Sequence, residues 1–159
     1  IYDAFMSAAI PEELSKLFLL WLFLHKNPYF DERMDGIVYA VCVSLGFAGL
    51  ENVLYVVLDE EWASVAISRA IFAVPGHFCF GVLMGYFYSL AKFEPQHRMR
   101  YSALALLAPI VAHGIYDSLL FIMQVYIPTW LESILLLGFL VFCFYLWKWA
   151  SKSIKRHVN

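Results

Sequence analysis

Five long apolar segments dominate this sequence and restrict what it can fold into. They cover approximately residues 3–25, 36–58, 63–92, 101–124 and 129–150. A membrane-spanning helix needs about 20 consecutive apolar residues, so each segment is long enough to cross a bilayer. Only 15% of the 159 residues are charged, whereas an average soluble domain has about 25%. The sequence therefore predicts an all-α, polytopic membrane helix bundle with about five transmembrane helices, forming a single domain over residues 1–159.

Other classes of protein are disfavoured by the same composition. No segment alternates polar and apolar residues over the ~10 positions that a membrane β-strand requires. The three cysteines have no paired spacing, which argues against a disulfide framework or a cysteine-based zinc site. The net charge of −2 leaves no basic surface for nucleic acid. Because the chain begins at Ile1 rather than Met, we expect a fragment or a processed form.

The loops between the segments alternate in charge. Lys26 and Arg33 lie in the first connection, and Arg98 and Arg100 lie in the third, whereas residues 59–61 of the second are all acidic. The C-terminal tail is again basic. Basic loops face the cytoplasm in most membrane proteins. We therefore expect the first and third connections and the C-terminus to be cytoplasmic, with Ile1 outside.

Charged and polar residues interrupt four of the five segments. A charge at mid-bilayer costs at least ~2.5–3.5 kcal/mol, so each such residue suggests a function. These residues are Glu12, Glu13 and Lys16 in the first segment, Glu51 and Asn52 in the second, Arg69 and His77 in the third, and His113 and Asp117 in the fourth. We expect Arg69, which is nearer the outer end, to extend toward Asp59 or Glu60 at the outer surface.

The depths of these residues coincide. With a rise of 1.5 Å per residue, Glu12 and His113 lie roughly 18 Å from the cytoplasmic ends of their helices. Glu51 and His77 lie roughly 22–23 Å from theirs. Four helices are therefore predicted to place ionisable groups at one level, slightly outward of the membrane midplane.

Helical spacing also predicts which side chains share a face. Glu12 and Lys16 are four residues apart, as are His113 and Asp117. Small residues recur every four positions beside the site, and such stripes let two helices approach closely. The stripes are Ala73, His77, Gly81 and Gly85 in the third segment and Ala40, Ser44, Ala48 and Asn52 in the second. Pro11 and Pro109 each remove a backbone donor and can kink a helix near the site.

The residues alone leave several kinds of chemistry open. A buried glutamate can act as general base toward water, and a histidine can stabilise a developing oxyanion. Glutamate and histidine are also zinc ligands, although the sequence has no HExxH motif. Acids and histidines at this depth also serve proton or cation transport. A purely structural alternative makes Glu12–Lys16 an ion pair and His113–Asp117 an interhelical clamp.

Four short motifs together resemble a known family. Residues 12–16, Glu-Glu-Leu-Ser-Lys, resemble the EExxK motif of PrsW-type intramembrane proteases, and residues 47–52 resemble their FxxxEN motif. His77 stands where the family has a histidine on its third conserved helix, and residues 113–117 resemble the closing HxxxD motif. The motifs occur in the family's order and cover about residues 8–120. The distantly related type II CAAX prenyl endopeptidases have EExxxR instead, so we infer no prenylated substrate.

The resemblance implies a glutamate-dependent intramembrane endopeptidase of the bacterial inner membrane. Its substrate would be a single-span membrane protein resembling an anti-sigma factor, cut near the outer surface in a site-1 reaction. Glu12 or Glu13 would activate water, and His113 would polarise the scissile carbonyl or stabilise the oxyanion. His77 and Glu51 would complete the cavity, with Asn52 beside them. Asp117 would orient His113, and Lys16 would pair with a glutamate.

The resemblance implies no required cofactor, although a divalent metal such as zinc stays open. Two functions of other classes also stay open. One is a non-catalytic membrane scaffold that grips partner helices through the polar cluster. The other is a proton- or cation-coupled transporter, which the small size and the lack of an inverted repeat disfavour. The substrate's identity and the oligomeric state leave no mark in the sequence.

Overall fold

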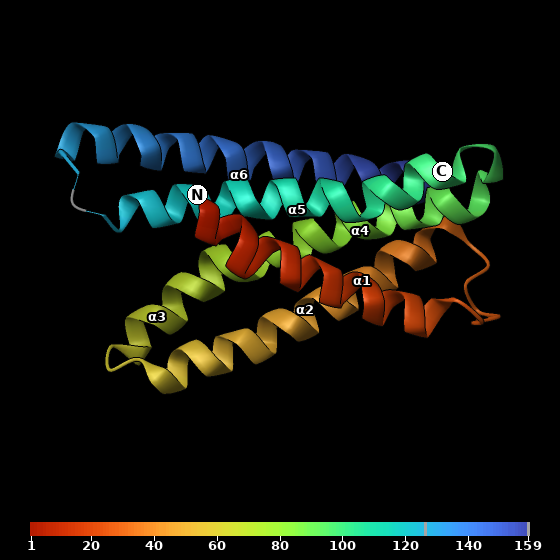
Figure 1. Ribbon diagram of the computed structural model, residues 1–159, viewed down its shortest axis with the longest axis horizontal. Helices are drawn as coiled ribbons and strands as arrows, with labels where there is room; N and C mark the ends of the chain where they lie inside the picture. The colour runs from red at the N-terminus through yellow and green to blue at the C-terminus, as the bar shows by residue number, and fades with distance from the viewer. Residues whose placement is uncertain (126, 159) are drawn as a thin grey trace.

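The computed structural model describes residues 1–125 and 127–158, and the regular elements among them are all helical (Figure 1). The elements are η1 (Ala4–Ala9), α1 (Ile10–Leu24), α2 (Arg33–Leu58), α3 (Trp62–Ser68), η2 (Arg69–Ala73), α4 (Val74–Phe93), η3 (Pro95–His97), α5 (Arg98–Met123) and α6 (Thr129–Val158). The observed α6 extends eight residues past the predicted end at 150, and α2 begins three residues before the predicted start at 36. The all-α fold class is confirmed.

Within the described part of the chain, four helices are long and apolar enough to cross a membrane. They are Arg33–Leu58, Trp62–Phe93, Pro95–Met123 and Thr129–Val158. The helix formed by η1 and α1 carries three charges, from Glu12, Glu13 and Lys16, and is not among the four. Its outer face exposes large apolar side chains such as Phe18 and Phe23, so a fifth span stays a prediction. Such extensive apolar exposure is typical of a surface that faces lipid, and the chain is a polytopic membrane helix bundle.

The packing is tightest between α2 and α4, where the two small-residue stripes meet. A Cβ atom on Gly81 would lie 2.9 Å from Cβ of Ser44, and one on Gly85 would lie 2.6 Å from Cα of Ile37. These distances leave no room for a side chain. The close approach leaves His77 only 4% exposed, so the prediction that the small residues bury this histidine is confirmed.

The π-helical turns η1 and η2 each end two residues before a proline. The turn η1 precedes Pro11 at the start of α1, and η2 precedes Pro75 at the start of α4. Proline cannot donate to the helical ladder, and a wide π turn is one way to accommodate the missing hydrogen bond. Pro109, in contrast, is buried inside the uninterrupted α5. The two turns lie one turn or less from Glu12, Arg69 and His77, which belong to the polar cluster described below.

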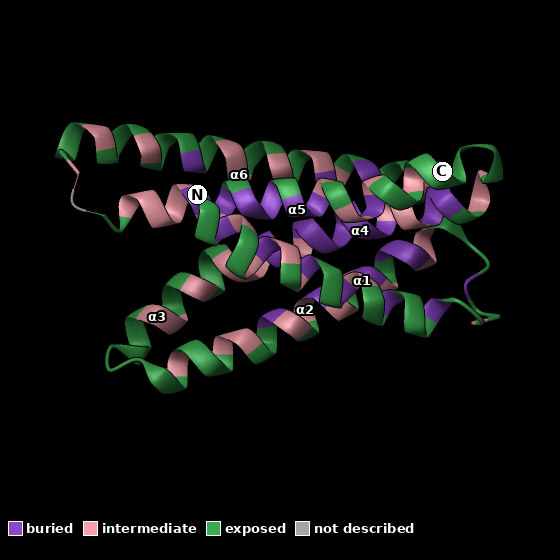
Figure 2. Ribbon diagram, viewed as in Figure 1, coloured by how far each residue is buried: buried purple, intermediate pink, exposed green. Residues whose placement is uncertain are grey.

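The connections alternate between the two ends of the bundle. The α1–α2 connection, the α4–α5 connection and the C-terminal end of α6 lie at one end, on the right in Figure 1. The α2–α3 connection lies at the other end, with the start of α6. Basic connections therefore share one end of the molecule. Buried residues concentrate along α4 and the middle of α5, with the exposed face of α6 outside them (Figure 2).

Candidate active site

Helix α1 supplies two glutamates and a lysine to the interior. Glu12, Glu13 and Lys16 lie within one turn, so their side chains meet. Nζ of Lys16 lies 2.6 Å from Oε1 of Glu13 and 3.4 Å from Oε2 of Glu12. The side chains of Glu13 and Lys16 are almost completely buried, whereas that of Glu12 is 16% exposed. The two neighbouring acids therefore occupy different environments, one sealed and one at the edge of the cluster.

Helices α2 and α4 supply Glu51 and His77. Nδ1 of His77 lies 3.0 Å from Nζ of Lys16, and its Nε2 lies 2.9 Å from Oε2 of Glu51. Because lysine only donates, Nδ1 of His77 accepts from Lys16, and Nε2–H donates to Glu51. Lys16 thus joins α1 to the α2–α4 pair through one histidine ring.

Helix α5 supplies the second histidine. Nδ1 of His113 lies 2.9 Å from Oε1 of Glu13, and its Nε2 lies 3.2 Å from Asp117 and 3.9 Å from Glu12. Both ring nitrogens therefore face carboxylates, and Asp117 holds the ring by the four-residue spacing noted in the sequence. Gly114 allows η1 to approach α5 closely beside this histidine, because a Cβ there would overlap the ring of Phe5 from η1.

Aromatic rings enclose the two histidines. The ring of Phe80 stacks on His113 with centroids 4.7 Å apart, and that of Phe47 lies 4.7 Å from Nζ of Lys16. The rings of His77 and His113 are themselves 5.5 Å apart. Charges in such an apolar enclosure interact more strongly than they do in water.

Arg69 belongs to the same cluster, and the prediction that it extends toward Asp59 or Glu60 is wrong. Its Nη2 lies 2.9 Å from Oε2 of Glu51, and its Nε donates to Oδ1 of Asn52 at 2.6 Å. Its guanidinium also lies over the ring of Tyr55. The carboxylate of Glu51 and the amide oxygen of Asn52 hold the guanidinium inside the cluster. They are less hydrated than the carboxylates of the outer loop, and two oxygens side by side suit the planar group of donors on arginine. The sequence carried one signal of this role, because residue 69 continues the four-residue stripe of residues 73, 77, 81 and 85.

All the predicted site residues are therefore in one cluster built from four helices. They are Glu12, Glu13, Lys16, Glu51, Asn52, His77, His113 and Asp117. Glu12, Glu51 and Asp117, with side chains 14–20% exposed, form its accessible rim.

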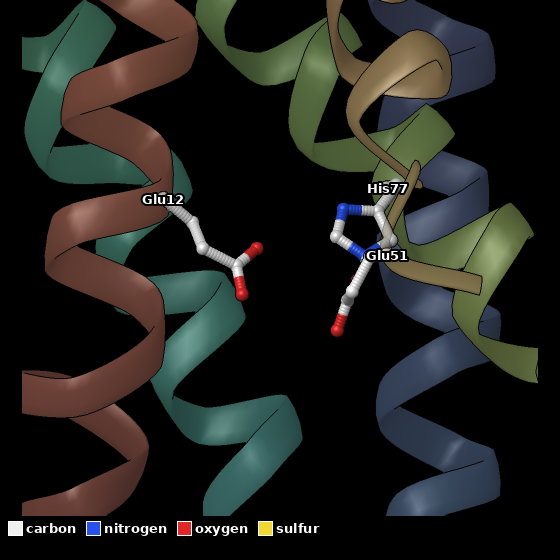
Figure 3. Close-up of side chains that lie close together, drawn as sticks. All are labelled: Glu12, Glu51 and His77. Carbon is white, nitrogen blue, oxygen red and sulfur yellow. The ribbon is translucent and has the colours of Figure 1, made fainter. Parts of the chain in front are cut away.

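Among residues 1–125 and 127–158, two groups of side chains could hold a metal ion. One is Glu12, Glu51 and His77, and the other is Glu12, Glu13 and His113; the possible ligand atoms of each lie within 4.8 Å of one another. In Figure 3 the carboxylate of Glu12 points toward His77 and Glu51. Each group offers two carboxylates and one imidazole, which are ligands of catalytic zinc sites.

Two further observations bear on whether a metal fits. Oε2 of Glu13 is buried and has no hydrogen-bond partner in the part of the chain that the structure describes. The cluster also holds four carboxylates against the cationic side chains of Lys16 and Arg69. One negative charge is left in excess when His113, whose ring nitrogens both face carboxylates, is protonated, and two are left when both histidines are neutral. Both the unpartnered oxygen and the excess negative charge suit a divalent cation.

Comparison with known proteins agrees with the motifs. The family described as PrsW family intramembrane metalloprotease matches residues 1–147. Protease PrsW of Geobacillus kaustophilus (strain HTA426) is 44% identical over 118 residues, covering 74% of this chain and 52% of that protein. Protease PrsW of Clostridioides difficile (strain 630) is 36% identical over 163 residues, covering 100% and 65%, and that of Bacillus subtilis (strain 168) is 35% identical over 156 residues, covering 98% and 66%.

The chain spans about half to two thirds of the length of these relatives. No solved structure matches it. The family match covers nearly the whole chain and includes every helix of the polar cluster, so this chain belongs to the PrsW family.

Proposed function

We propose that this chain is the catalytic core of an integral membrane endopeptidase that cleaves a membrane-anchored protein. One observation carries the proposal. Four helices bring two glutamates, two histidines and their partners together inside an apolar bundle, and Glu12 is left with a partly exposed carboxylate. A merely structural ion pair between α1 and its neighbours would not require the additional acids on the rim.

In this proposal Glu12 is the general base. A base must reach the water that attacks the substrate. The carboxylate of Glu12 points toward Glu51 and His77 (Figure 3) and is 16% exposed. Glu13, in contrast, is sealed behind Lys16 and His113. Glu13 then has the separate role of holding Lys16 and His113 in place. Of the two glutamates that the sequence left as alternatives, the geometry favours Glu12.

The histidines would act on the scissile carbonyl. Nε2 of His113 lies between Glu12 and Asp117 at the accessible rim, where it can donate to an oxygen that gains negative charge. Such a preorganised donor in a site that excludes water is a large source of catalysis. His77, fixed on both sides by Lys16 and Glu51, would form the opposite wall of the site.

The donor set also accommodates the metal that the family description names. Glu12 would hold a divalent cation such as zinc together with either Glu13 and His113 or Glu51 and His77. When bound, the cation would supply Lewis-acid polarisation of the scissile carbonyl. Cleavage with and without a chelator, described below, distinguishes this arrangement from one in which no cofactor is required.

The substrate and the membrane complete the proposal. We expect a single-span membrane protein resembling an anti-sigma factor, cut near the outer surface of the bacterial inner membrane. The basic α1–α2 and α4–α5 connections and the C-terminus would be cytoplasmic, with Ile1 outside. Their common position at one end of the bundle supports this orientation (Figure 1).

The direct test is cleavage of tagged single-span substrates by the full chain in detergent. Wild type is compared with Glu12→Gln, Glu13→Gln and His113→Ala, and Glu132→Gln at the start of α6 is the matched control. We expect Glu12→Gln to lower the cleavage rate by at least about 10²-fold without a change in unfolding temperature. Glu13→Gln should lower both cleavage and unfolding temperature, because it disturbs a buried ion pair.

Unchanged cleavage by the Glu12→Gln variant would refute the role of Glu12, and cleavage by a variant lacking both glutamates would refute the glutamate mechanism. Cleavage lost with a chelator and restored by zinc would make the same residues metal ligands. Cleavage retained with a chelator would favour activation of water by Glu12 alone.

A further inference from the structure

A large cavity in the bundle lies apart from the polar cluster. It has a volume of about 730 Å³ and opens between α1, the α1–α2 connection and the α4–α5 end of the molecule. No residue of the candidate active site lines it. The cavity therefore needs an explanation of its own.

One end of the cavity is strongly basic. Lys26, Lys92 and Arg98 line it, and no carboxylate does so among the described residues. Glu94 pairs with Arg33 at 3.3 Å, and Asp35 caps the start of α2. Lys26 and Arg98 form no ion pair within residues 1–125 and 127–158. Positive charge is thus concentrated in the lining of the cavity.

The other end of the cavity is apolar and open to the outside of α1. Leu14, Phe18 and Trp21 line it and are 45%, 61% and 47% exposed. They extend over seven residues of α1, or about 10 Å, starting from the basic end. An apolar channel that runs along a membrane helix from a cluster of cations has the shape and polarity of one phospholipid.

We propose that this cavity binds an anionic phospholipid, with its phosphate at Lys26 and Arg98 and an acyl chain along Leu14, Phe18 and Trp21. Basic pockets between transmembrane helices are sites of this kind. Lys92 has a structural role as well, because its Nζ donates to the carbonyl of Phe30 and lies over the ring of that residue. The headgroup would meet the two cations that the described chain leaves unpaired. A zwitterionic phospholipid carries its own compensating positive charge, so it would gain less binding free energy from these two cations.

The lipid would also contact the helix that carries the catalytic acids. Leu17 lines the cavity, and the adjacent Lys16 pairs with Glu13. A bound lipid would therefore support α1 against α4 and α5 from outside. This inference concerns a binding site and does not depend on the proposed protease activity.

The test uses the full chain in an uncharged detergent, titrated with phosphatidylglycerol or phosphatidylcholine. Native mass spectrometry measures the retained lipid, and thermal unfolding measures stabilisation. The variant Lys26→Gln/Arg98→Gln is compared with Arg100→Gln/Lys152→Gln, which removes the same charge from positions that do not line the cavity. We expect wild type to retain phosphatidylglycerol preferentially, and each lining cation removed to weaken binding about fivefold, equivalent to about 1 kcal/mol. The control pair should stay close to wild type.

Equal retention of the two lipids by wild type would overturn the proposal. So would an equal loss in both double variants, because it would indicate a diffuse surface potential rather than a site. Displacement of the lipid by inorganic phosphate alone would indicate a soluble phosphate ligand and would also overturn it. If the double variant fails to fold, Lys26→Gln alone, in the exposed connection, provides the same comparison with Arg100→Gln.

Discussion

Nζ of Lys16 lies 2.6 Å from Oε1 of Glu13, and neither side chain is more than 1% exposed. Such a buried pair is costly to form, because both charges lose their water. Here the cost is offset by further contacts, since Lys16 also reaches Glu12 and His77, and Glu13 also reaches His113. The pair therefore fixes α1 against two other helices, α4 and α5.

Replacing Lys16 by Met should destabilise the protein by about 3–5 kcal/mol, because Glu13 would then be buried without a compensating charge. Thermal or denaturant unfolding in detergent measures the change. Lys148→Met, at an exposed position of α6, is the control and should have little effect. Equal stability of the two variants would contradict the structural role of Lys16.

The close contact between α2 and α4 predicts that alanine substitutions at two glycines will affect stability differently. Gly85→Ala places a methyl group against the backbone of α2, with Cα of Ile37 only 2.6 Å away, so we expect a loss of about 1–3 kcal/mol in unfolding free energy. Gly49→Ala is the matched control, because nothing lies within 4 Å of its added Cβ. That change should be neutral or slightly stabilising, since alanine favours a helix by up to about 1 kcal/mol over glycine. Equal effects at the two positions would mean that α2 and α4 are not in close contact.

We expect Arg69 to support the cleavage activity. Because Arg69 forms an ion pair with Glu51 and donates a hydrogen bond to Asn52, Arg69→Gln should lower the cleavage rate by about 10–100-fold, as loss of supporting contacts around a site typically does. Arg69→Lys should recover only part of the rate, because lysine lacks the planar fork. Full activity of Arg69→Gln would refute a supporting role for Arg69 at the site.

The charge of the cluster predicts a response to divalent cations. Zinc should raise the unfolding temperature of the chelator-treated chain, and Glu12→Gln should reduce this shift, because Glu12 is common to both possible ligand groups. Glu132→Gln should leave the shift intact. A wild-type unfolding temperature that does not respond to zinc would argue against a metal in this cluster.

The sequence determined the class of the protein and which residues belong to the polar cluster. Apolar segment length predicts a membrane helix bundle, because the bilayer sets how long a spanning helix must be. Residue spacing along single helices predicts the pairs Glu12–Lys16 and His113–Asp117, because contacts within one helix depend only on its fixed geometry. Common depth predicts that the four helices contribute to one site, and the family motifs name the same residues.

Only the tertiary structure decided how exposed each of those residues is and which partners it contacts. Glu12 and Glu13 are adjacent and chemically identical, and their difference in exposure depends on which helices pack against α1. The inward direction of Arg69 likewise depends on α2 lying within reach of η2. The lipid cavity is formed by segments about 70 residues apart in the chain. Contacts between helices depend on their rotation and crossing, which periodicity along one segment cannot specify.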